Sequence, residues 1–327
     1  MDVSGVKKPR VAITGLSSFT GAAIANRLSI NGYNVVGQTL GLKKNYTDLK
    51  RNRLVSLEKS IQLNEGINCE DDSIVDWIME VKPKIWIHHH HYMKDFRSPD
   101  YDLEKARQVA VQPCEKIVRT LSLSGCQGII YSGTMFEPGE SGGQDLSKVG
   151  KYAISKSEAW LDLVRLSEIY GIRISKVVIP NVFGPRENKD RLIPKLISNA
   201  MRHKPMRLKN PSHTADNIPI NNLADTYVDA VEFLLEGGHS QYRPSGWIVD
   251  VGSFCREVNK SLIEKYLGVA PCEIELTDGA VEENLIRECE TKATTLNLEK
   301  VWQEYALWLK AGSNLNLYMR GNKDAES

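Results

Sequence analysis

The sequence predicts an α/β fold built on a parallel sheet, followed by a smaller and less regular lobe. In the first half of the chain, short runs of β-branched residues alternate with amphipathic segments, as in parallel strands covered by helices. The first of these runs leads directly into a glycine-bearing loop and then into a helical segment. After Pro185 the alternation weakens, and charged and proline-bearing stretches follow. These observations divide the chain into a main domain and a second lobe.

The individual elements follow from these patterns. The expected strands of the main domain are residues 10–14, 34–38, 55–62, 84–88, 128–132 and 174–179. The expected helices between them are residues 21–31, 72–81, 103–124 and 149–170. Farther along, helices are predicted at residues 222–235, 258–267 and 298–309, and a strand at 247–251. We place the main domain at residues 1–180 and the lobe at 181–327, and we expect the strand at 247–251 to rejoin the main sheet.

The composition is that of an ordinary globular protein. The 327 residues are 41% hydrophobic and 25% charged, and the net charge of +1 indicates neither a nucleic-acid nor a membrane-surface partner. No apolar run approaches the roughly 18–20 residues of a membrane span, and the first residues lack the apolar core of a signal peptide. Six scattered cysteines without a Cys-x-x-Cys spacing predict reduced thiols and a cytoplasmic protein. They are Cys69, Cys114, Cys126, Cys255, Cys272 and Cys289.

The loop at residues 14–21 is the first candidate binding element. It lies between a predicted strand and a predicted helix, which is the context that a dinucleotide-binding loop requires. Gly15 allows a tight turn, and Gly21 lets the helix pack closely on the strand. Ser18 replaces the usual middle glycine but is still small. The free amides at the helix N-terminus would face a diphosphate, so we predict a Rossmann-type doubly wound sheet that binds a dinucleotide.

The end of the second strand bears on the choice of cofactor. An acidic residue there holds the ribose of NAD, whereas a basic residue accommodates the extra phosphate of NADP. Residues 38–40 carry no carboxylate, and Lys43 and Lys44 follow closely. Since a lysine can pair with a phosphate, this pattern favours NADP and leaves NAD as the alternative.

Tyr152 and Lys156 are the candidate proton-transfer pair. They lie four residues apart in a predicted helix, so their side chains are neighbours on one face. A fixed ammonium beside a phenol favours the phenolate and lowers the tyrosine pKa from about 10. The pair therefore predicts a tyrosine that can give and take a proton near neutral pH.

The order of these features resembles that of the extended short-chain dehydrogenase/reductase family. The shared features are the first strand, the loop with Gly15 and Gly21, a Ser-Gly-Thr sequence after a strand, Tyr152 and Lys156. Four further segments are similar to family motifs, and the resemblance covers about residues 10–310. They are residues 32–37, 85–88, 179–185 and 217–224. Most members of this branch act on nucleotide-activated sugars, which implies a nucleotide-diphosphate sugar as the partner of this chain.

The resemblance implies roles for individual residues. Thr134 would hydrogen-bond the reacting oxygen, Tyr152 would transfer its proton, and Lys156 would hold the nicotinamide ribose. The alignment takes Gly139 as a family glycine, and a shift of one or two residues would name Ser132 in place of Thr134. The cofactor would be bound by Gly15, Ser18, Phe19, Thr20, Gly21, Lys43, Lys44, His88, Lys156 and Pro180. The substrate would be bound by Thr134, Asn181, Arg186, Arg191 and Arg207.

The residues after Thr134 bear on the type of reaction. Dehydratases of the family carry an acidic pair there, but this chain has Met135 and Phe136, with Glu137 one position further. Without this pair a dehydratase is disfavoured. Since strand two carries no acidic residue for NAD, and reductases of the family commonly use NADPH whereas epimerases usually retain NAD, we favour ketoreduction of a keto-sugar with Tyr152 as proton donor. A C4-epimerase that retains NAD is the alternative. A 4,6-dehydratase or a non-catalytic cofactor-binding relative ranks lower. The resemblance also implies a homodimer formed through the predicted helices at 103–124 and 149–170.

Four consecutive histidines, His88 to His91, follow the predicted strand at 84–88. Adjacent strand residues face opposite sides of a sheet, so at most two of these side chains point the same way. No cluster of carboxylates or cysteines with ligand spacing accompanies them. We predict no metal site here, and either a polar wall beside the cofactor or plain packing and exposure.

Overall fold

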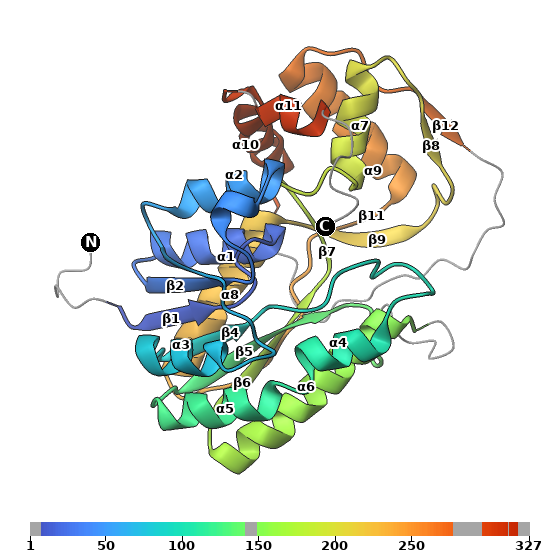
Figure 1. Ribbon diagram of the computed structural model, residues 1–327. Helices are drawn as coiled ribbons and strands as arrows, with labels where there is room; N and C mark the ends of the chain where they lie inside the picture. The colour runs from blue at the N-terminus through green and yellow to red at the C-terminus, as the bar shows by residue number, and fades with distance from the viewer. Residues whose placement is uncertain (1–7, 141–148, 277–295, 313, 320–327) are drawn as a thin grey trace. The chain divides into compact units, whose positions relative to one another are not determined.

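The computed structural model describes residues 8–140, 149–276, 296–312 and 314–319, which form two compact units (Figure 1). The first unit contains the described residues up to Pro180 together with Asn221–Pro244. The second contains Asn181–Ile220 and the described residues from Ser245 onward. The chain therefore passes from the first unit to the second and back again, so the two units interleave in sequence.

A seven-stranded parallel sheet forms the centre of the first unit. Among the described residues its strand order is β10-β6-β5-β4-β1-β2-β3, and every neighbouring pair is parallel. The strands are β1 (Arg10–Ile13), β2 (Asn34–Thr39), β3 (Gln62–Glu65), β4 (Ile85–His88), β5 (Gly128–Thr134), β6 (Arg173–Ile179) and β10 (Gln241–Tyr242). This is the doubly wound order, in which the chain changes direction between β1 and β4.

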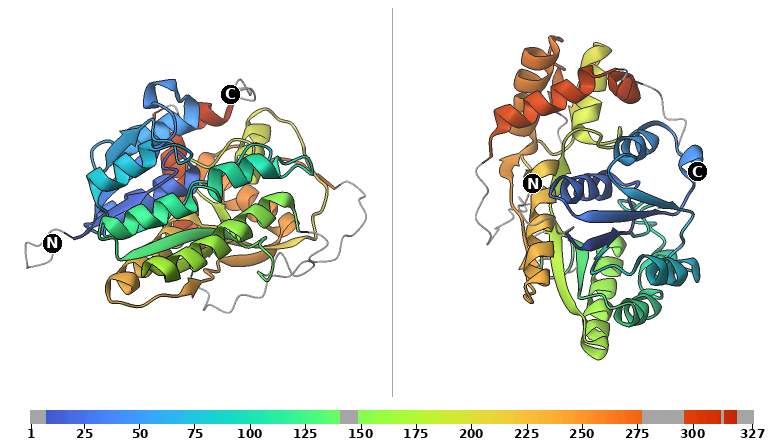
Figure 2. Two further views of the ribbon diagram at one scale, coloured as in Figure 1. Left: turned by 60° about the horizontal axis from the view of Figure 1, so that its bottom comes forward. Right: turned by 90° about the vertical axis from the view of Figure 1, so that its left-hand side faces the viewer.

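Helices cover both faces of this sheet. They are α1 (Phe19–Ile30), α2 (Asp48–Leu57), α3 (Ser73–Val81), α4 (Leu103–Ala110), α5 (Cys114–Leu123), α6 (Lys151–Tyr170) and α8 (Ile220–Leu235), with a 3₁₀ turn η1 (Lys43–Asn45). The helices α3, α5 and α6 pack together on one face, whereas α1 and α8 lie on the other (Figure 2). Arg27 Nη2 of α1 donates to Asp225 Oδ2 of α8 at 2.7 Å. Because both faces are covered, Ile85, Trp86 and Ile87 of β4 are all fully buried.

The second unit carries two small sheets. In one, β11 (Trp247–Asp250) pairs antiparallel with β9 (Thr214–Pro219), which pairs parallel with β7 (Asn181–Phe183). In the other, β8 (Met206–Leu208) pairs with β12 (Ile274–Leu276). The helices are α7 (Leu192–Met201), α9 (Val251–Glu257), the π-helical segment η3 (Val258–Leu267), α10 (Leu298–Lys310) and α11 (Asn314–Met319).

Two sequence predictions about strands were wrong. The segment 247–251 does not rejoin the main sheet, because β11 pairs with β9 and the edge next to β6 is taken by β10. The expected strand at 55–62 is instead the end of α2 followed by β3. The buried residues Leu49, Leu54 and Leu57 recur at helical spacing, while Val55 is exposed.

The predicted helix at 103–124 is divided into α4 and α5 by Pro113. Proline has no amide hydrogen and cannot make the helical bond to the carbonyl four residues earlier, that of Val109. The Val109 carbonyl is instead bonded by His90 Nε2 at 3.3 Å. A histidine of the run 88–91 thus satisfies the backbone carbonyl that the break in the helix leaves without its helical partner.

Within the described residues, no helix is long and apolar enough to cross a membrane. The five described cysteines, Cys69, Cys114, Cys126, Cys255 and Cys272, are free and buried, and Cys289 lies outside the described residues.

The second unit contains a buried carboxyl group, that of Glu187. Tyr305 OH donates to its Oε1 at 2.8 Å, and Arg191 Nε donates to its Oε2 at 3.0 Å. Burial nevertheless raises the pKa of Glu187 to about 7, because the interior disfavours the charged form more than these partners favour it.

This raised pKa predicts a pH-dependent stability. Since the folded pKa exceeds the unfolded one, the stabilising contribution of protonated Glu187 is present below about pH 4.5 and is lost as the pH rises to about 7. We expect the free energy of unfolding of the wild type, relative to Glu187→Gln, to fall by an amount on the order of 1–3 kcal/mol over that range. Urea unfolding at a series of pH values measures this difference, and a difference independent of pH would contradict the assignment.

Candidate active site

The change of direction between β1 and β4 brings two loops together at the carboxyl end of the sheet. The loop after β1 begins at Thr14, and the histidine run follows β4. Thr14 Oγ1 accepts hydrogen bonds from the amides of His89 at 2.9 Å and His90 at 3.0 Å. In doubly wound sheets, ligands bind at this edge, where the strand order reverses.

The loop after β1 has the geometry that the sequence predicted for a diphosphate site. Gly15 has a φ of +72°, which favours glycine, and a Cβ on Gly21 would lie 2.5 Å from the Gly15 carbonyl oxygen. Ser18 is the N-cap of α1, and its Oγ accepts from the Gly21 amide at 2.9 Å. The amides of Phe19 and Thr20 precede Gly21 in the first turn, where the helix offers no internal acceptor. These residues fit the diphosphate of a dinucleotide.

Two side chains to which the sequence analysis assigned no role hydrogen-bond the backbone of this loop. Gln38 of β2 is buried, and its Oε1 accepts from the Gly15 amide at 3.0 Å. Arg53 of α2 is also buried, and its Nη1 donates to the Ser17 carbonyl at 3.2 Å. Gln38 therefore occupies the end of strand two as a support for the loop.

The side chains of the four histidines point to three places, because those of His88 and His90 lie together. The ring of His90 lies 4.4 Å from that of His88, His89 reaches the phosphate loop, and His91 Nε2 lies 2.9 Å from Ser155 Oγ of α6. No group of three or more His, Cys, Asp or Glu that could hold a metal occurs in the described part of the chain. Burial lowers the pKa of all four, to about 3 for His89 and about 4 for His90, so that they are neutral at pH 7.

His89 connects the phosphate loop to β5. Its Nε2 lies 2.8 Å from Thr20 Oγ1, and its Nδ1 lies 2.7 Å from Ser132 Oγ. Ser132 Oγ also lies 2.7 Å from the hydroxyl of Tyr227 in α8. The Ser132 hydroxyl is thus held between two side chains, which favours Thr134 for the role that the alignment assigned to either residue. His88 itself is fully buried beneath this layer, with its Nδ1 facing Trp86 Nε1 at 3.4 Å.

The side chain of Lys156 extends from α6 to the carboxyl end of β5. It is buried on α6, and its Nζ donates to the Ser132 carbonyl oxygen at 2.8 Å and lies 5.1 Å from the centre of the Tyr131 ring. Burial lowers the pKa of Lys156 to about 8, while the charge of Glu137 acts in the opposite direction.

Tyr152 lies among aromatic rings. The ring centres of His91, Phe96 and Tyr101 lie 5.3 to 6.0 Å from the centre of the Tyr152 ring. All three rings meet the Tyr152 ring edge-on. Burial raises the pKa of Tyr152 above its usual 10, with further contributions from Tyr101 and Glu137. We predicted that Lys156 lowers the pKa of Tyr152, and for the protein without ligands this was wrong. Burial of the phenol away from water is the largest influence on this pKa, and it raises it.

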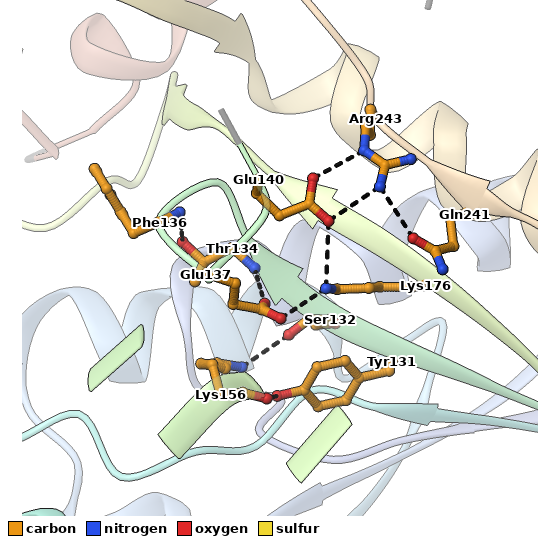
Figure 3. Close-up of polar contacts among 10 residues, drawn as sticks. All are labelled: Tyr131, Ser132, Thr134, Phe136, Glu137, Glu140, Lys156, Lys176, Gln241 and Arg243. Carbon is orange, nitrogen blue, oxygen red and sulfur yellow. Dashed lines mark hydrogen bonds and ion pairs between the residues drawn. The ribbon is translucent and has the colours of Figure 1, made fainter. Parts of the chain in front are cut away.

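Thr134 ends β5 and leads into a cluster of buried charges (Figure 3). Its amide donates to Glu137 Oε1 at 2.6 Å, and its hydroxyl oxygen accepts a long bond of 3.5 Å from the Phe136 amide. Glu137 Oε2 in turn accepts from Lys176 of β6 at 2.6 Å. No sequence motif predicted this arrangement around Glu137.

The remaining predicted cofactor residues have other partners or lie at the edge of the unit. Lys43 and Lys44 form the turn η1, where the Lys43 ammonium pairs with Glu58 and the Lys43 amide donates to Glu65 Oε2 at 2.9 Å. Pro180 directly follows β6 and is the last residue of this part of the first unit.

The predicted substrate residues beyond Thr134 belong to the second unit. Asn181 begins β7, and Arg186 has a φ of +70° and lies 6.0 Å from the Trp308 ring. Arg191 is bonded to Glu187, as described above. Arg207 is an exposed residue of β8 whose Nε donates to Glu275 Oε2 at 2.8 Å.

The fold and the site define a Rossmann-type protein of the extended short-chain dehydrogenase/reductase class. Residues 11–241 match the sequence profile of the NAD dependent epimerase/dehydratase family, which covers more than half of the chain. The chain therefore belongs to this family of enzymes, as the sequence resemblance predicted. No curated protein matches the sequence at a significant level.

Solved structures show the same fold. The UDP-glucuronic acid 4-epimerase of Bacillus cereus, in complex with UDP-glucuronic acid and NAD, has a TM-score of 0.73 at 16% identity, over 92% of this chain and 99% of that one. The UDP-glucose 4-epimerase of Brucella ovis, in complex with NAD, has a TM-score of 0.73 at 16% identity, over 91% and 98% of the two chains. A UDP-N-acetylglucosamine 4-epimerase of Methanobrevibacter ruminantium has a TM-score of 0.70 at 16% identity, over 93% and 99%.

These similarities bear on the cofactor prediction. The three structures named above are those of 4-epimerases, and at 16% identity they show the fold of this chain. Two of these complexes contain NAD, and none of these findings supports a preference for NADP. The pairing of Lys43 with Glu58 also weakens the argument that this lysine is reserved for a phosphate.

Proposed function

We propose that this chain is a nucleotide-sugar 4-epimerase that retains NAD and acts on a UDP-sugar or a related nucleotide-diphosphate sugar. The observation that carries the proposal is the position of Lys156, whose Nζ is bonded to the Ser132 carbonyl beside Thr134, while Tyr152 lies one turn earlier on the same helix. The epimerases of similar fold support the reaction type and the cofactor.

The residues of the first unit supply the functions that such a reaction needs. The amides at the N-terminus of α1 would hold the diphosphate of the cofactor, and Lys156 would hold its nicotinamide ribose. Bound NAD would supply reversible hydride transfer at the sugar carbon. Tyr152 has to act as the phenolate, so its pKa, which burial raises in the protein without ligands, must fall when cofactor and substrate bind. It then removes the proton from the sugar hydroxyl and later returns it, while the Thr134 hydroxyl donates a hydrogen bond to the same oxygen.

The environment of Glu137 argues against a dehydratase. Elimination of water needs an acidic residue that can reach the sugar, and Met135 and Phe136 cannot transfer protons. Glu137 is 1% exposed, and both of its oxygens are bonded, to the Thr134 amide and to Lys176. Its carboxylate is therefore fixed within the protein.

We also propose that the protein is a homodimer in the cytoplasm. The outer surfaces of α5 and α6 carry exposed apolar side chains, Leu123, Leu161 and Ile169, which a second copy of these helices would cover. The free thiols of the described cysteines fit a reducing compartment.

The proposal predicts turnover without net redox change. The purified protein should interconvert a UDP-sugar and its 4-epimer, with UDP-glucuronic acid, UDP-glucose and UDP-N-acetylglucosamine as first substrates. Added NAD should suffice, and the absorbance of reduced nicotinamide should not change in proportion to product. Product ratios are measured by proton NMR. Stoichiometric oxidation of NADPH with a 4-keto sugar would instead show a ketoreductase.

A further inference from the structure

Where β4 ends, two backbone groups of β5, the Ser132 carbonyl and the Thr134 amide, have no neighbouring strand of the described chain to bond. The last residue pair of the two strands joins His88 and Tyr131, so residues 132–134 extend beyond β4. The Met135 amide donates to Ile179 of β6, and because backbone groups of adjacent strand residues face opposite sides, Ser132 and Thr134 face the side that β4 has left. Buried groups in this position need new partners.

Two side chains of opposite charge provide these partners. The Lys156 ammonium donates to the Ser132 carbonyl at 2.8 Å, and the Glu137 carboxylate accepts from the Thr134 amide at 2.6 Å. The capped groups are two residues apart on one strand edge. A cation and an anion are thus fixed near each other directly beside the proposed proton-transfer residues.

Lys176 holds the Glu137 carboxylate in this position (Figure 3). Its Nζ lies 2.6 Å from Glu137 Oε2 and 3.4 Å from Glu140 Oε1, and all three side chains are buried. Glu140 is bonded to Arg243 Nε at 2.8 Å, which continues the cluster toward the surface. A Cβ on Gly133 would lie 2.6 Å from Lys176 Cε and 2.8 Å from Glu137 Oε1, so any other residue there would displace the ends of these two side chains.

We propose that Glu137 and Lys176 are positioning residues of the catalytic site: the pair fixes the Thr134 backbone and sets the charge balance around the ammonium of Lys156. The catalytic role in this inference rests on the proposed function. The effect of the pair on the pKa of Lys156 does not, because it can be measured without turnover. A buried ion pair alone is weak evidence of a stability role, whereas the direct bond to Thr134 ties this one to the site.

The two members of the pair act on Lys156 with opposite sign. Negative Glu137 favours the charged ammonium and raises the pKa of Lys156, whereas positive Lys176 lowers it, with Glu137 having the larger effect. The other groups facing Lys156 are the Tyr131 ring, the Ser132 carbonyl, Tyr152 and the neutral histidines 88–91. Among the side chains around Lys156, Glu137 and Lys176 are the two whose charges act on the pKa of Lys156.

The test is a titration of Lys156 by NMR in full-length protein labelled with ¹³Cε-lysine. The Lys156 resonance is assigned by its loss in Lys156→Met. We expect a midpoint near the pKa of about 8 in the wild type. In Glu137→Gln the midpoint should fall by roughly one pH unit, and in Lys176→Gln it should rise. The double variant, which leaves no unpaired charge at the pair, should have a midpoint below the wild type but above Glu137→Gln.

Glu140→Gln is the matched control, because it removes a carboxylate from the same cluster without removing the bond to Thr134. Its Lys156 midpoint should move less than that of Glu137→Gln. Shifts in the same direction in both single variants of the pair, or an equal shift in Glu140→Gln, would overturn the proposal. If a single variant does not fold, as judged by circular dichroism, the double variant decides, since an unchanged midpoint there contradicts the larger effect of Glu137. If the wild-type protein shows no epimerase activity, the proposed function is refuted, but the expected order of the Lys156 midpoints is not affected.

Discussion

Tyr152→Phe is expected to lower the rate of epimerisation by roughly 100- to 10,000-fold, the range that removal of a general acid–base group gives. The substitution removes only the phenol oxygen, so the ring contacts with His91, Phe96 and Tyr101 remain. Binding of NADH, followed by its fluorescence, should be retained, because no predicted cofactor contact is lost. The rates are measured with the UDP-sugar that the wild type converts.

Tyr170→Phe is the matched control for this prediction. Tyr170 ends the same helix, where its hydroxyl lies 3.5 Å from Glu115 Oε1 at the surface. It should turn over substrate at the wild-type rate. Undiminished turnover in Tyr152→Phe would refute the assignment of Tyr152. Cofactor binding without turnover in the wild type as well would instead identify the chain as a non-catalytic relative.

Gly21→Ala is expected to weaken NADH binding at least about tenfold, or about 1.4 kcal/mol. In an open helix this change would be favourable by about 1 kcal/mol, because alanine is the better helix former. Here the new Cβ would lie 2.5 Å from the Gly15 carbonyl oxygen and 2.7 Å from Ser18 Oγ. Since the nearest atom belongs to the backbone, the loop itself must move, and the amides of Phe19 and Thr20 would no longer face the diphosphate together.

Gly150→Ala serves as the control for a glycine substitution at the start of a helix. Gly150 precedes α6 with a φ of −71°, and a Cβ there meets no atom within 4 Å. Its NADH affinity should equal that of the wild type. Equal affinities in wild type and Gly21→Ala would show that the loop after β1 does not bind the diphosphate, and thermal unfolding of both variants separates a local from a global effect.

The sequence predicted best where the signal is confined to a few consecutive residues. The strand, turn and helix around Gly15 and Gly21 form one continuous segment, and the spacing of Tyr152 and Lys156 lies within one helical turn. Both were predicted at the positions where the structure has them. The expected strand at 55–62 failed because Val55 and Leu57 suit a strand locally, while burial of Leu49, Leu54 and Leu57 on one side of a helix decided otherwise.

By itself, the sequence determined the doubly wound fold and the positions of two local features, the loop with Gly15 and Gly21 and the helical turn with Tyr152 and Lys156, because each depends on local periodicity or a short motif. The tertiary structure decided the electrostatics of the site. The raised pKa of Tyr152 reflects its burial on α6 against rings of the segment between β4 and α4, and His89 meets Thr20 and Ser132 only because β1, β4 and β5 are adjacent. Glu137 meets Lys176 across 39 residues and Glu140 meets Arg243 across 103, and charges so far apart in sequence leave no pattern that reveals their contact.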